Sequence, residues 1–231
     1  SFNPSTVSTA GTSAVALATT GATPAGTYMI TITGTSGSLQ HTSKVTLVVN
    51  AAIAGGESVN LGSAYNVTGM VTDGIALSSG LLDGQGYAYS ANLLGSTVAF
   101  RGSTFTLGSA NAPDAVSSTT IPLPAGRYST LAMLATGVNG NQASQTFVVN
   151  YSDGSNTTLV QNLSDWFTPQ NYSGESQAVT MAYRDTAGGS KDARTFYLYG
   201  YSFALNNAKT ATSIKLPNNG DVAVFAITVA P

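Results

Sequence analysis

The stretch of residues 121–166 repeats a two-residue alternation that suits a β-strand and no helix. Phe147, Val149 and Tyr151 alternate with other residues, and a second extended run begins at Leu159. Successive side chains of a strand point to opposite faces, so the alternation predicts strands with one buried face. An Asp-Gly pair at 153–154 separates the two runs and signals a tight hairpin turn. The stretch therefore predicts the centre of an antiparallel β-sandwich.

The rest of the chain continues this pattern on both sides. Its alternation predicts roughly three or four short strands in residues 1–50 and about ten after residue 58, with at most one helical turn at 90–94. Residues 51–57, AAIAGGE, lose the alternation and carry a Gly-Gly pair, which predicts a linker. We therefore expect an all-β chain with a truncated Ig-like sandwich at 1–50 and a larger jelly-roll-like antiparallel β-sandwich at 58–231.

One turn sequence occurs twice. PAGTY at 24–28 recurs as PAGRY at 124–128, each time before a strand. Proline fixes φ, glycine permits a positive φ, and a tyrosine just inside the next strand can donate its hydroxyl back to the turn, as in a tyrosine corner. The flanking sequences differ, so we interpret the recurrence as convergent turn chemistry rather than as an internal repeat.

Composition narrows the function classes. Charged residues make up 8 % of the chain, the net charge is −2, and neither sign forms a run, so we expect no nucleic-acid partner. Cysteine is absent, which excludes disulfides, thiolate metal sites and cysteine nucleophiles. No apolar run reaches the roughly 18 residues of a membrane span, so we expect no membrane insertion. A start at Ser1 suggests a processed or excised piece of a larger protein.

Several segments carry a resemblance to known families. Residues 2–49, from FNPSTVSTAG to KVTLVV, resemble the second half of the Ig-like repeats of large secreted bacterial proteins. LDGQGYAYSANLLG, IPLPAGRYSTLAMLATGVNG, YSDG, SDWF and FYLYGYSFAL resemble the C-terminal β-sandwich modules of secreted bacterial peptidases, sedolisin-like ones among them, and of glycoside hydrolases. The resemblance implies an extracellular accessory module within a larger secreted bacterial enzyme.

The sequence contains few of the residues from which catalytic sites are built. His41 is the only histidine, and the large unit has none to serve a Ser-His-Asp triad. The carboxylates of Asp83, Asp165, Glu175 and Asp185 can in principle converge as in a glycosidase, but several acidic residues stand in turn sequences where Asp caps its own backbone. We therefore predict no enzyme activity, with a carboxylate-dependent glycoside hydrolase as an open alternative.

A metal site is possible only with oxygen ligands. With neither cysteine nor clustered histidine, Ca²⁺ is the plausible cation, and modules of the kind this chain resembles often hold one structurally. Asp83 and Asp114 are the candidate ligands, and the absence of a metal is an equal alternative. We predict no other cofactor.

Aromatic residues are the remaining candidates for ligand binding. Alternation places Tyr197, Tyr199 and Tyr201 on one face of a strand, where they line the core or form a platform for sugars. Trp166 and Tyr172 lie in DWFTPQNYSG, whose Pro, Asn and Gly mark a loop, and a tryptophan tucked into the core is the alternative to an exposed one. The predicted ligand-binding residues are Trp166, Tyr172, Tyr87, Tyr89, Arg184 and Asp185.

Three functions follow in order of preference. The first is a non-catalytic carbohydrate-binding module that takes a polysaccharide or glycan. The second is a structural or surface-association module of a secreted peptidase without a small ligand. The third is the glycoside hydrolase.

Overall fold

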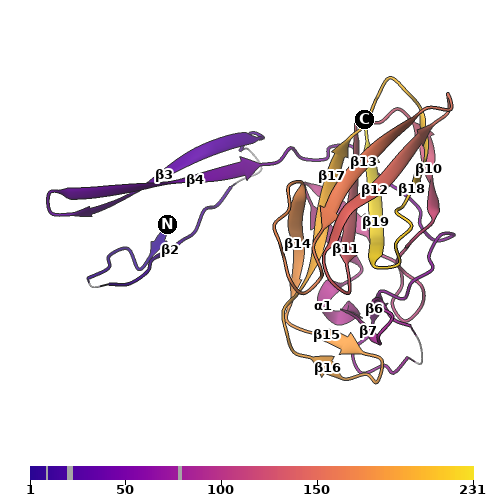
Figure 1. The fold of residues 1–231 in the computed structure, drawn as a ribbon, viewed down its shortest axis with the longest axis horizontal. Coiled ribbons are helices and arrows are strands. Elements are labelled where there is room, and N and C mark those ends of the chain that lie inside the picture. Colours follow the sequence, from indigo (N-terminus) through magenta and orange to yellow (C-terminus); the bar gives the residue numbers. More distant parts are fainter. Residues whose placement is uncertain (9, 20–22, 78–79) are drawn as a thin grey trace. The chain divides into compact units, whose positions relative to one another are not determined.

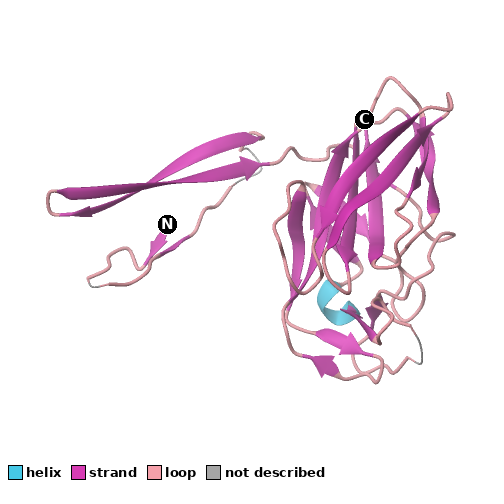
Figure 2. Cartoon of the chain, in the orientation of Figure 1, coloured by secondary structure: helices cyan, strands magenta, loops and turns pink. Residues whose placement is uncertain are grey.

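The computed structural model describes residues 1–8, 10–19, 23–77 and 80–231, which divide into two compact units, Ser1–Ala52 and Ile53–Pro231. Strands dominate both units (Figure 1, Figure 2). The one helix among the described residues is α1 (Ala91–Leu94), the predicted helical turn, whose N-cap Ser90 accepts a hydrogen bond from the Leu93 amide. No helix among the described residues is long and apolar enough to cross a membrane. The predicted all-β fold is confirmed.

The first unit consists of two hairpins. Its strands are β1 (Phe2–Asn3), β2 (Ala14–Val15), β3 (Gly26–Ser36) and β4 (Leu39–Val49). β1 pairs with β2 and β3 pairs with β4, both antiparallel, and Gly37 makes the β3–β4 turn with φ of 59°. Each sheet in the described part of this unit has two strands, and the Ig-like character of this unit stays a prediction.

The second unit is a β-sandwich of two main antiparallel sheets. The five-stranded sheet has the order β14-β17-β11-β19-β5, and the four-stranded sheet has the order β10-β18-β12-β13. The strands of the first are β14 (Glu175–Met181), β17 (Phe196–Ala204), β11 (Thr130–Gly137), β19 (Val222–Ala230) and β5 (Glu57–Ser58), and those of the second are β10 (Thr120–Gly126), β18 (Ala211–Lys215), β12 (Gln142–Tyr151) and β13 (Asn156–Leu163). Successive strands often lie in different layers, so the chain crosses repeatedly between the two sheets.

The strands and the hairpin predicted within residues 121–166 are confirmed, but β10 and β13 lie at the edges of the four-stranded sheet rather than at its centre. β12 and β13 pair as an antiparallel hairpin, and the turn between them is the Asp-Gly pair at 153–154. Gly154 has φ of 83°, and the Asp153 carboxylate accepts a hydrogen bond from the Ser155 amide at 3.0 Å. Phe147 and Val149 are fully buried, as the alternation predicted.

Apolar side chains cover both faces of the five-stranded sheet. One face packs against the four-stranded sheet through a core that includes Leu131, Tyr199 and Ile227. The other face packs, through Leu134 and Phe225, against a second core. That core includes residues of α1, of the hairpin of β8 (Thr97–Phe100) and β9 (Ser103–Thr106), and of β7 (Tyr87–Ser90) and β6 (Met70–Val71). β7 and β6 form a small sheet with β15 (Arg184–Thr186) and β16 (Lys191–Asp192). Buried residues therefore fill every position of β19, without alternation.

The predicted linker is shorter than expected. Ile53 is buried, and its amide donates to the Arg101 carbonyl at 2.7 Å. Glu57 pairs with Val229 at the edge of the five-stranded sheet. A Cβ on Gly56 would lie 2.5 Å from the Thr228 methyl group, so glycine here permits the close approach of the chain to the sheet. The second half of the 51–57 stretch therefore belongs to the sandwich.

Both predicted tyrosine corners are present. The hydroxyl of Tyr128 donates to the Pro124 carbonyl at 3.1 Å, and the hydroxyl of Tyr28 donates to the Pro24 carbonyl at 2.8 Å. A Cβ on Gly126 would lie 2.4 Å from the Tyr128 ring, so the ring folds back over a residue that must lack a side chain.

The tyrosines of β17 belong to the core rather than to a binding platform. Tyr199 and Tyr201 are fully buried between the two sheets. Their hydroxyls are satisfied there, because Tyr199 donates to the Asp165 carbonyl at 2.9 Å and Tyr201 donates to the Glu175 carboxylate at 2.7 Å. The core interpretation of this stripe is therefore confirmed.

Candidate functional site

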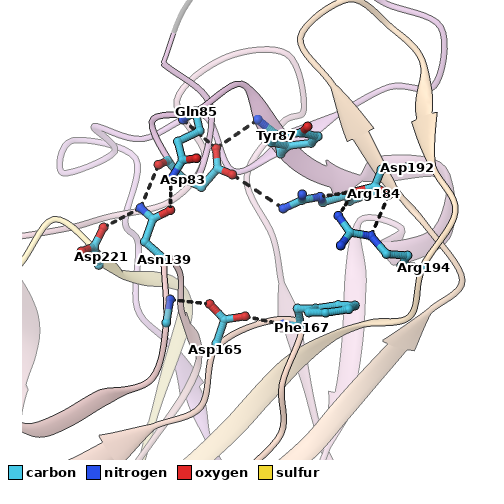
Figure 3. A network of polar contacts seen from close by, with 11 residues as sticks. Asp83, Gln85, Tyr87, Asn139, Asp165, Phe167, Arg184, Asp192, Arg194 and Asp221 are labelled. Atoms are coloured by element: carbon cyan, nitrogen blue, oxygen red, sulfur yellow. Dashed lines mark hydrogen bonds and ion pairs between the residues drawn. The ribbon is translucent and has the colours of Figure 1, made fainter.

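A cleft of about 220 Å³ is lined by charged, amide and aromatic side chains of the second unit. The lining residues come from the turn before β7 and its first residue, the β11–β12 turn, the segment after β13, β15, the segment between β16 and β17, and the start of β17. They are Asp83, Gln85, Tyr87, Asn139, Asp165, Trp166, Phe167, Arg184, Arg194 and Phe196. Figure 3 shows most of these side chains and the polar contacts that connect them.

Arg184 lies among three aromatic rings of the cleft. Its guanidinium carbon is 3.6 Å from the centroid of Tyr87, 4.7 Å from that of Phe196 and 4.8 Å from that of Trp166. A guanidinium is attracted to aromatic faces at such distances, and its planar shape allows it to stack on them. The packing leaves the Arg184 side chain 11 % exposed, so the position of this cation is fixed.

Asp192 holds the two arginines of the cleft beside each other (Figure 3). Its carboxylate accepts from Nε of Arg184 at 2.9 Å, from Nε of Arg194 at 2.9 Å, and from Nη2 of Arg194. Hydrogen bonds from Arg194 and then from Arg184 lower the pKa of Asp192 below its usual value. Arg194 stays half-exposed and places its guanidinium carbon 4.7 Å from the Phe167 centroid, so it presents a fixed donor to solvent.

Asp83 shapes the turn that closes one side of the cleft. One carboxylate oxygen accepts from the amides of Gln85 at 2.8 Å and Tyr87 at 3.1 Å, and the other lies 3.6 Å from Nη1 of Arg184. Gly84 within this turn has φ of 68°. The predicted structural use of Asp83 as a turn cap is confirmed.

Asp165 and Asn139 close the opposite side. The Asp165 carboxylate accepts from the amides of Gly140 and Phe167, each at 2.8 Å. The Asn139 amide donates to the Asp83 carbonyl at 2.9 Å and to the Asp221 carboxylate at 2.8 Å, and its oxygen accepts from Gln85. Asn139 thus joins the turn before β7 to the β11–β12 turn, and both carboxylates of the cleft are occupied by backbone donors.

The family of AziU2-like beta-sandwich domains matches residues 55–231. The chain belongs to this family. A comparison with curated proteins finds no match. All ten cleft residues fall within the matched range, so the cleft is a feature of the AziU2-like domain itself. The predicted β-sandwich module is confirmed, and its association with secreted peptidases or glycoside hydrolases stays a prediction.

Trp166 forms the floor of the cleft, and of the two alternatives that its loop-like sequence left open, the structure shows the buried one. Its side chain is 3 % exposed and packs edge-on against Tyr89, with ring centroids 5.2 Å apart. The Trp166 amide donates to the Gly137 carbonyl at 2.9 Å, and the Trp166 carbonyl accepts from the Tyr197 amide at 2.8 Å. These bonds tie the segment to two strands of the AziU2-like domain and turn the indole inward.

The other predicted binding residues lie in different places. Tyr87 and Arg184 line the cleft with Trp166. Tyr89 is fully buried beneath it, and its hydroxyl donates to the Tyr197 carbonyl. Tyr172 is half-buried outside the cleft lining, and Asp185 is fully buried away from it.

Five lining residues were not predicted from the sequence, and they are Gln85, Asn139, Phe167, Arg194 and Phe196. The Asn-Gly pair at 139–140 signals a turn, and Asn139 has φ of 57°, but no sequence signal places this turn beside Asp83. No local sequence motif marks Arg194 as a residue of a binding site.

The two candidate metal ligands lie in separate environments of the AziU2-like domain. Asp83 is engaged at the cleft as described above. The fully buried Asp114 carboxylate accepts from the amides of Gly69 at 2.6 Å and Met70 at 3.1 Å, and burial raises its pKa to about 7. The described residues contain no group of three or more His, Cys, Asp or Glu side chains arranged to hold a metal ion.

Proposed function

We propose that this AziU2-like domain is a non-catalytic carbohydrate-binding module, and that the cleft beside Arg184 and Arg194 is its site. The observation that carries the proposal is the set of oriented polar groups around an aromatic floor. Sites for small polar ligands combine an apolar lining with a few fixed polar groups. Asp192 fixes both guanidiniums, and Asn139 and Gln85 add amide groups.

The charge of the lining favours a neutral ligand. Two carboxylates, of Asp83 and Asp165, face two guanidiniums, of Arg184 and Arg194, so the charges of the lining balance. A sugar offers hydroxyls that both donate and accept, which suits such a mixed lining. Phe167 is 39 % exposed and provides an apolar surface for the C–H face of a sugar ring.

The size of the cleft limits how much ligand it takes. Its volume of about 220 Å³ lies below the roughly 300 to 1,000 Å³ of sites for drug-sized ligands. We therefore expect it to accept one sugar ring or a terminal group of a longer glycan.

The carboxylates of the cleft are poorly suited to hydrolysis. A glycosidase needs carboxyl oxygens that are free to reach the glycosidic oxygen and a water molecule, whereas oxygens already bonded to backbone amides are not free for these roles. Asp83 accepts two backbone amides and lies beside Arg184, and Asp165 accepts two further amides. These contacts favour a structural use of both residues and a binding role for the cleft.

The proposal includes the setting of the domain. We infer that it works outside the cell as part of a larger secreted bacterial protein, with the unit Ser1–Ala52 as a spacer. The low content of charged residues suits this setting.

A glycan array with the intact chain tests the proposal. A bound glycan should lose at least tenfold in affinity with Arg194→Gln and with Phe167→Leu, and Arg127→Gln, at an exposed arginine outside the cleft lining, should bind as the parent does. Equal binding by all three variants would remove the cleft as the site. If the array retains no glycan, carbohydrate binding is wrong and the structural-module function takes its place.

A further inference from the structure

Asp185 lies on the face of β15 opposite to the cleft. Arg184 pairs with Asp192 across β15 and β16, whereas Asp185 pairs with Lys191 on the same two strands. Neighbouring residues of a strand point to opposite faces, so one short strand presents Arg184 to the cleft and Asp185 to the interior. The Asp185 side chain is fully buried.

Neither carboxylate oxygen of Asp185 receives a hydrogen bond from any described group. The neighbouring Asp73, in the segment after β6, has several donors. Its carboxylate accepts from the Ser90 hydroxyl at 2.5 Å and the Tyr183 hydroxyl at 2.7 Å, and it pairs with Nζ of Lys191 at 2.8 Å. These three donors therefore bond to Asp73 and not to Asp185.

Asp73 and Asp185 share their neighbours, because Lys191, which pairs with the Asp73 carboxylate, lies opposite Asp185 across β15 and β16. Two ionised carboxylates side by side in a buried place repel each other, and a single shared proton removes the repulsion and supplies the missing donor. Burial, followed by the charge of Asp73, raises the pKa of Asp185 to about 6. Burial also opposes ionisation of Asp73, but hydrogen bonds from Lys191, Ser90 and Tyr183 outweigh it and lower the pKa of Asp73 to about 2.

We propose that Asp185 is held as a carboxylic acid that donates its hydrogen to the Asp73 carboxylate, and that this proton fixes β15 and thereby Arg184 in the cleft. The charged groups that act on Asp185 in the described structure are Asp73 and Lys191 from β16. Tyr183, just before β15, bonds to Asp73, and β7 contributes Ala88 opposite Asp185. Loss of the proton places a second charge beside Asp73 and loosens β15. The effect on ligand binding rests on the proposed function of the cleft. The affinity of the cleft for a glycan should then fall as the pH rises through 6.

Carboxyl-detected NMR of Asp-labelled protein tests the shared proton without any glycan. Asp185 should titrate with a midpoint near pH 6, and Asp73→Asn should move this midpoint down, because the substitution removes the neighbouring charge. A midpoint of Asp185 below pH 4.5 in the parent chain would overturn the proposal. So would stabilisation by millimolar Ca²⁺ that Asp185→Asn abolishes, since a shared cation would then take the place of the proton.

Fluorescence of Trp166 tests the link to the cleft. Trp166 is the only tryptophan of the chain, and its ring lies 4.8 Å from the Arg184 guanidinium, so its emission reports on Arg184. The emission should change between pH 5 and 7 in the parent and in Asp153→Asn, a control in the β12–β13 turn. In Asp185→Asn, whose amide imitates the protonated acid, the step should vanish while the fold is retained. A step that persists in Asp185→Asn would refute the coupling even if glycan binding is confirmed.

Discussion

The guanidinium carbon of Arg184 lies 3.6 Å from the centroid of the Tyr87 ring. The same side chain bonds to Asp192 at 2.9 Å and lies 3.6 Å from Asp83. One planar cation thus joins an aromatic floor to two carboxylates that stand on different segments. Arg184 therefore organises the cleft, and its replacement should affect the whole domain.

We expect Arg184→Met to destabilise the second unit by about 2 to 4 kcal/mol, because it removes the cation beside Asp83 and one of the two arginines that bond to Asp192. Urea denaturation measures the free energy of unfolding. The matched control is Arg127→Met at an exposed position, which should change it by less than about 0.5 kcal/mol. A loss below about 1 kcal/mol for Arg184→Met would show that the ion pairs and stacked rings contribute little net stability.

The tyrosine corner at Tyr128 should contribute to stability through its hydroxyl. Tyr128→Phe removes the hydrogen bonds to the Pro124 carbonyl and to Glu57, and the free energy of unfolding should fall by about 1 kcal/mol. Tyr28→Phe removes the equivalent bond to Pro24 in the first unit, where the ring is 37 % exposed, so we expect a smaller loss. Equal losses in thermal unfolding of the two variants would contradict this dependence on burial.

Gly200 should not tolerate a side chain. A Cβ there would lie 2.5 Å from carbons of the Phe100 ring, so Gly200→Ala should cost about 1 to 3 kcal/mol through overpacking. Phe100→Leu shortens the opposing side chain, and the double variant should lose less than the sum of the two single losses. Strict additivity in denaturant unfolding would mean that the two positions do not compete for space.

Asp114 should make the protein less stable as the pH rises. Burial raises the pKa of Asp114 to about 7 in the folded state, so the native protein binds a proton that the unfolded chain releases from about pH 4 upward. Stability should therefore fall between pH 4.5 and 7.5, for this group by roughly 2 to 4 kcal/mol. Ionisation of Asp185 should lower the free energy of unfolding further, and this second loss is complete near pH 6.

The comparison is urea denaturation at pH 4.5 and 7.5. Asp114→Asn should reduce the difference between the free energies of unfolding at the two pH values. Asp153→Asn should keep it, because the Ser155 hydroxyl and then Lys209 lower the pKa of Asp153, whose contribution is lost only in stronger acid. A parent protein that is more stable at pH 7.5 than at pH 4.5 would show that Asp114 does not hold its proton.

Local patterns predicted most of the β architecture. The alternation at Phe147 and Val149 predicted a buried strand face, and the Asp-Gly pair at 153–154 predicted the hairpin turn. The repeated PAG-x-Tyr sequence predicted both tyrosine corners. These features depend on residues within a few positions of each other, so the sequence contains everything needed to predict them.

The cleft could not be predicted in the same way. Asp83, Asn139, Arg184 and Arg194 stand on separate segments, and only the pairing of β7 with β15 and the position of the β11–β12 turn bring them to one place. Trp166 shows the same limit, because its loop-like sequence fits both an exposed and a buried ring. Hydrogen bonds to Gly137 and Tyr197, far from it in the chain, turn it inward.

The sequence by itself determined that the chain is all-β, where its hairpins turn, and which strand residues face a core, since side-chain period and turn chemistry act locally. The tertiary structure alone decided that Arg184 lies over Tyr87 and that Asp185, the next residue, is buried beside Asp73. A strand sends adjacent side chains to opposite faces, and what each face meets depends on the strands and loops that pack against it. The chemistry of both residues therefore arises from neighbours that are distant in the sequence.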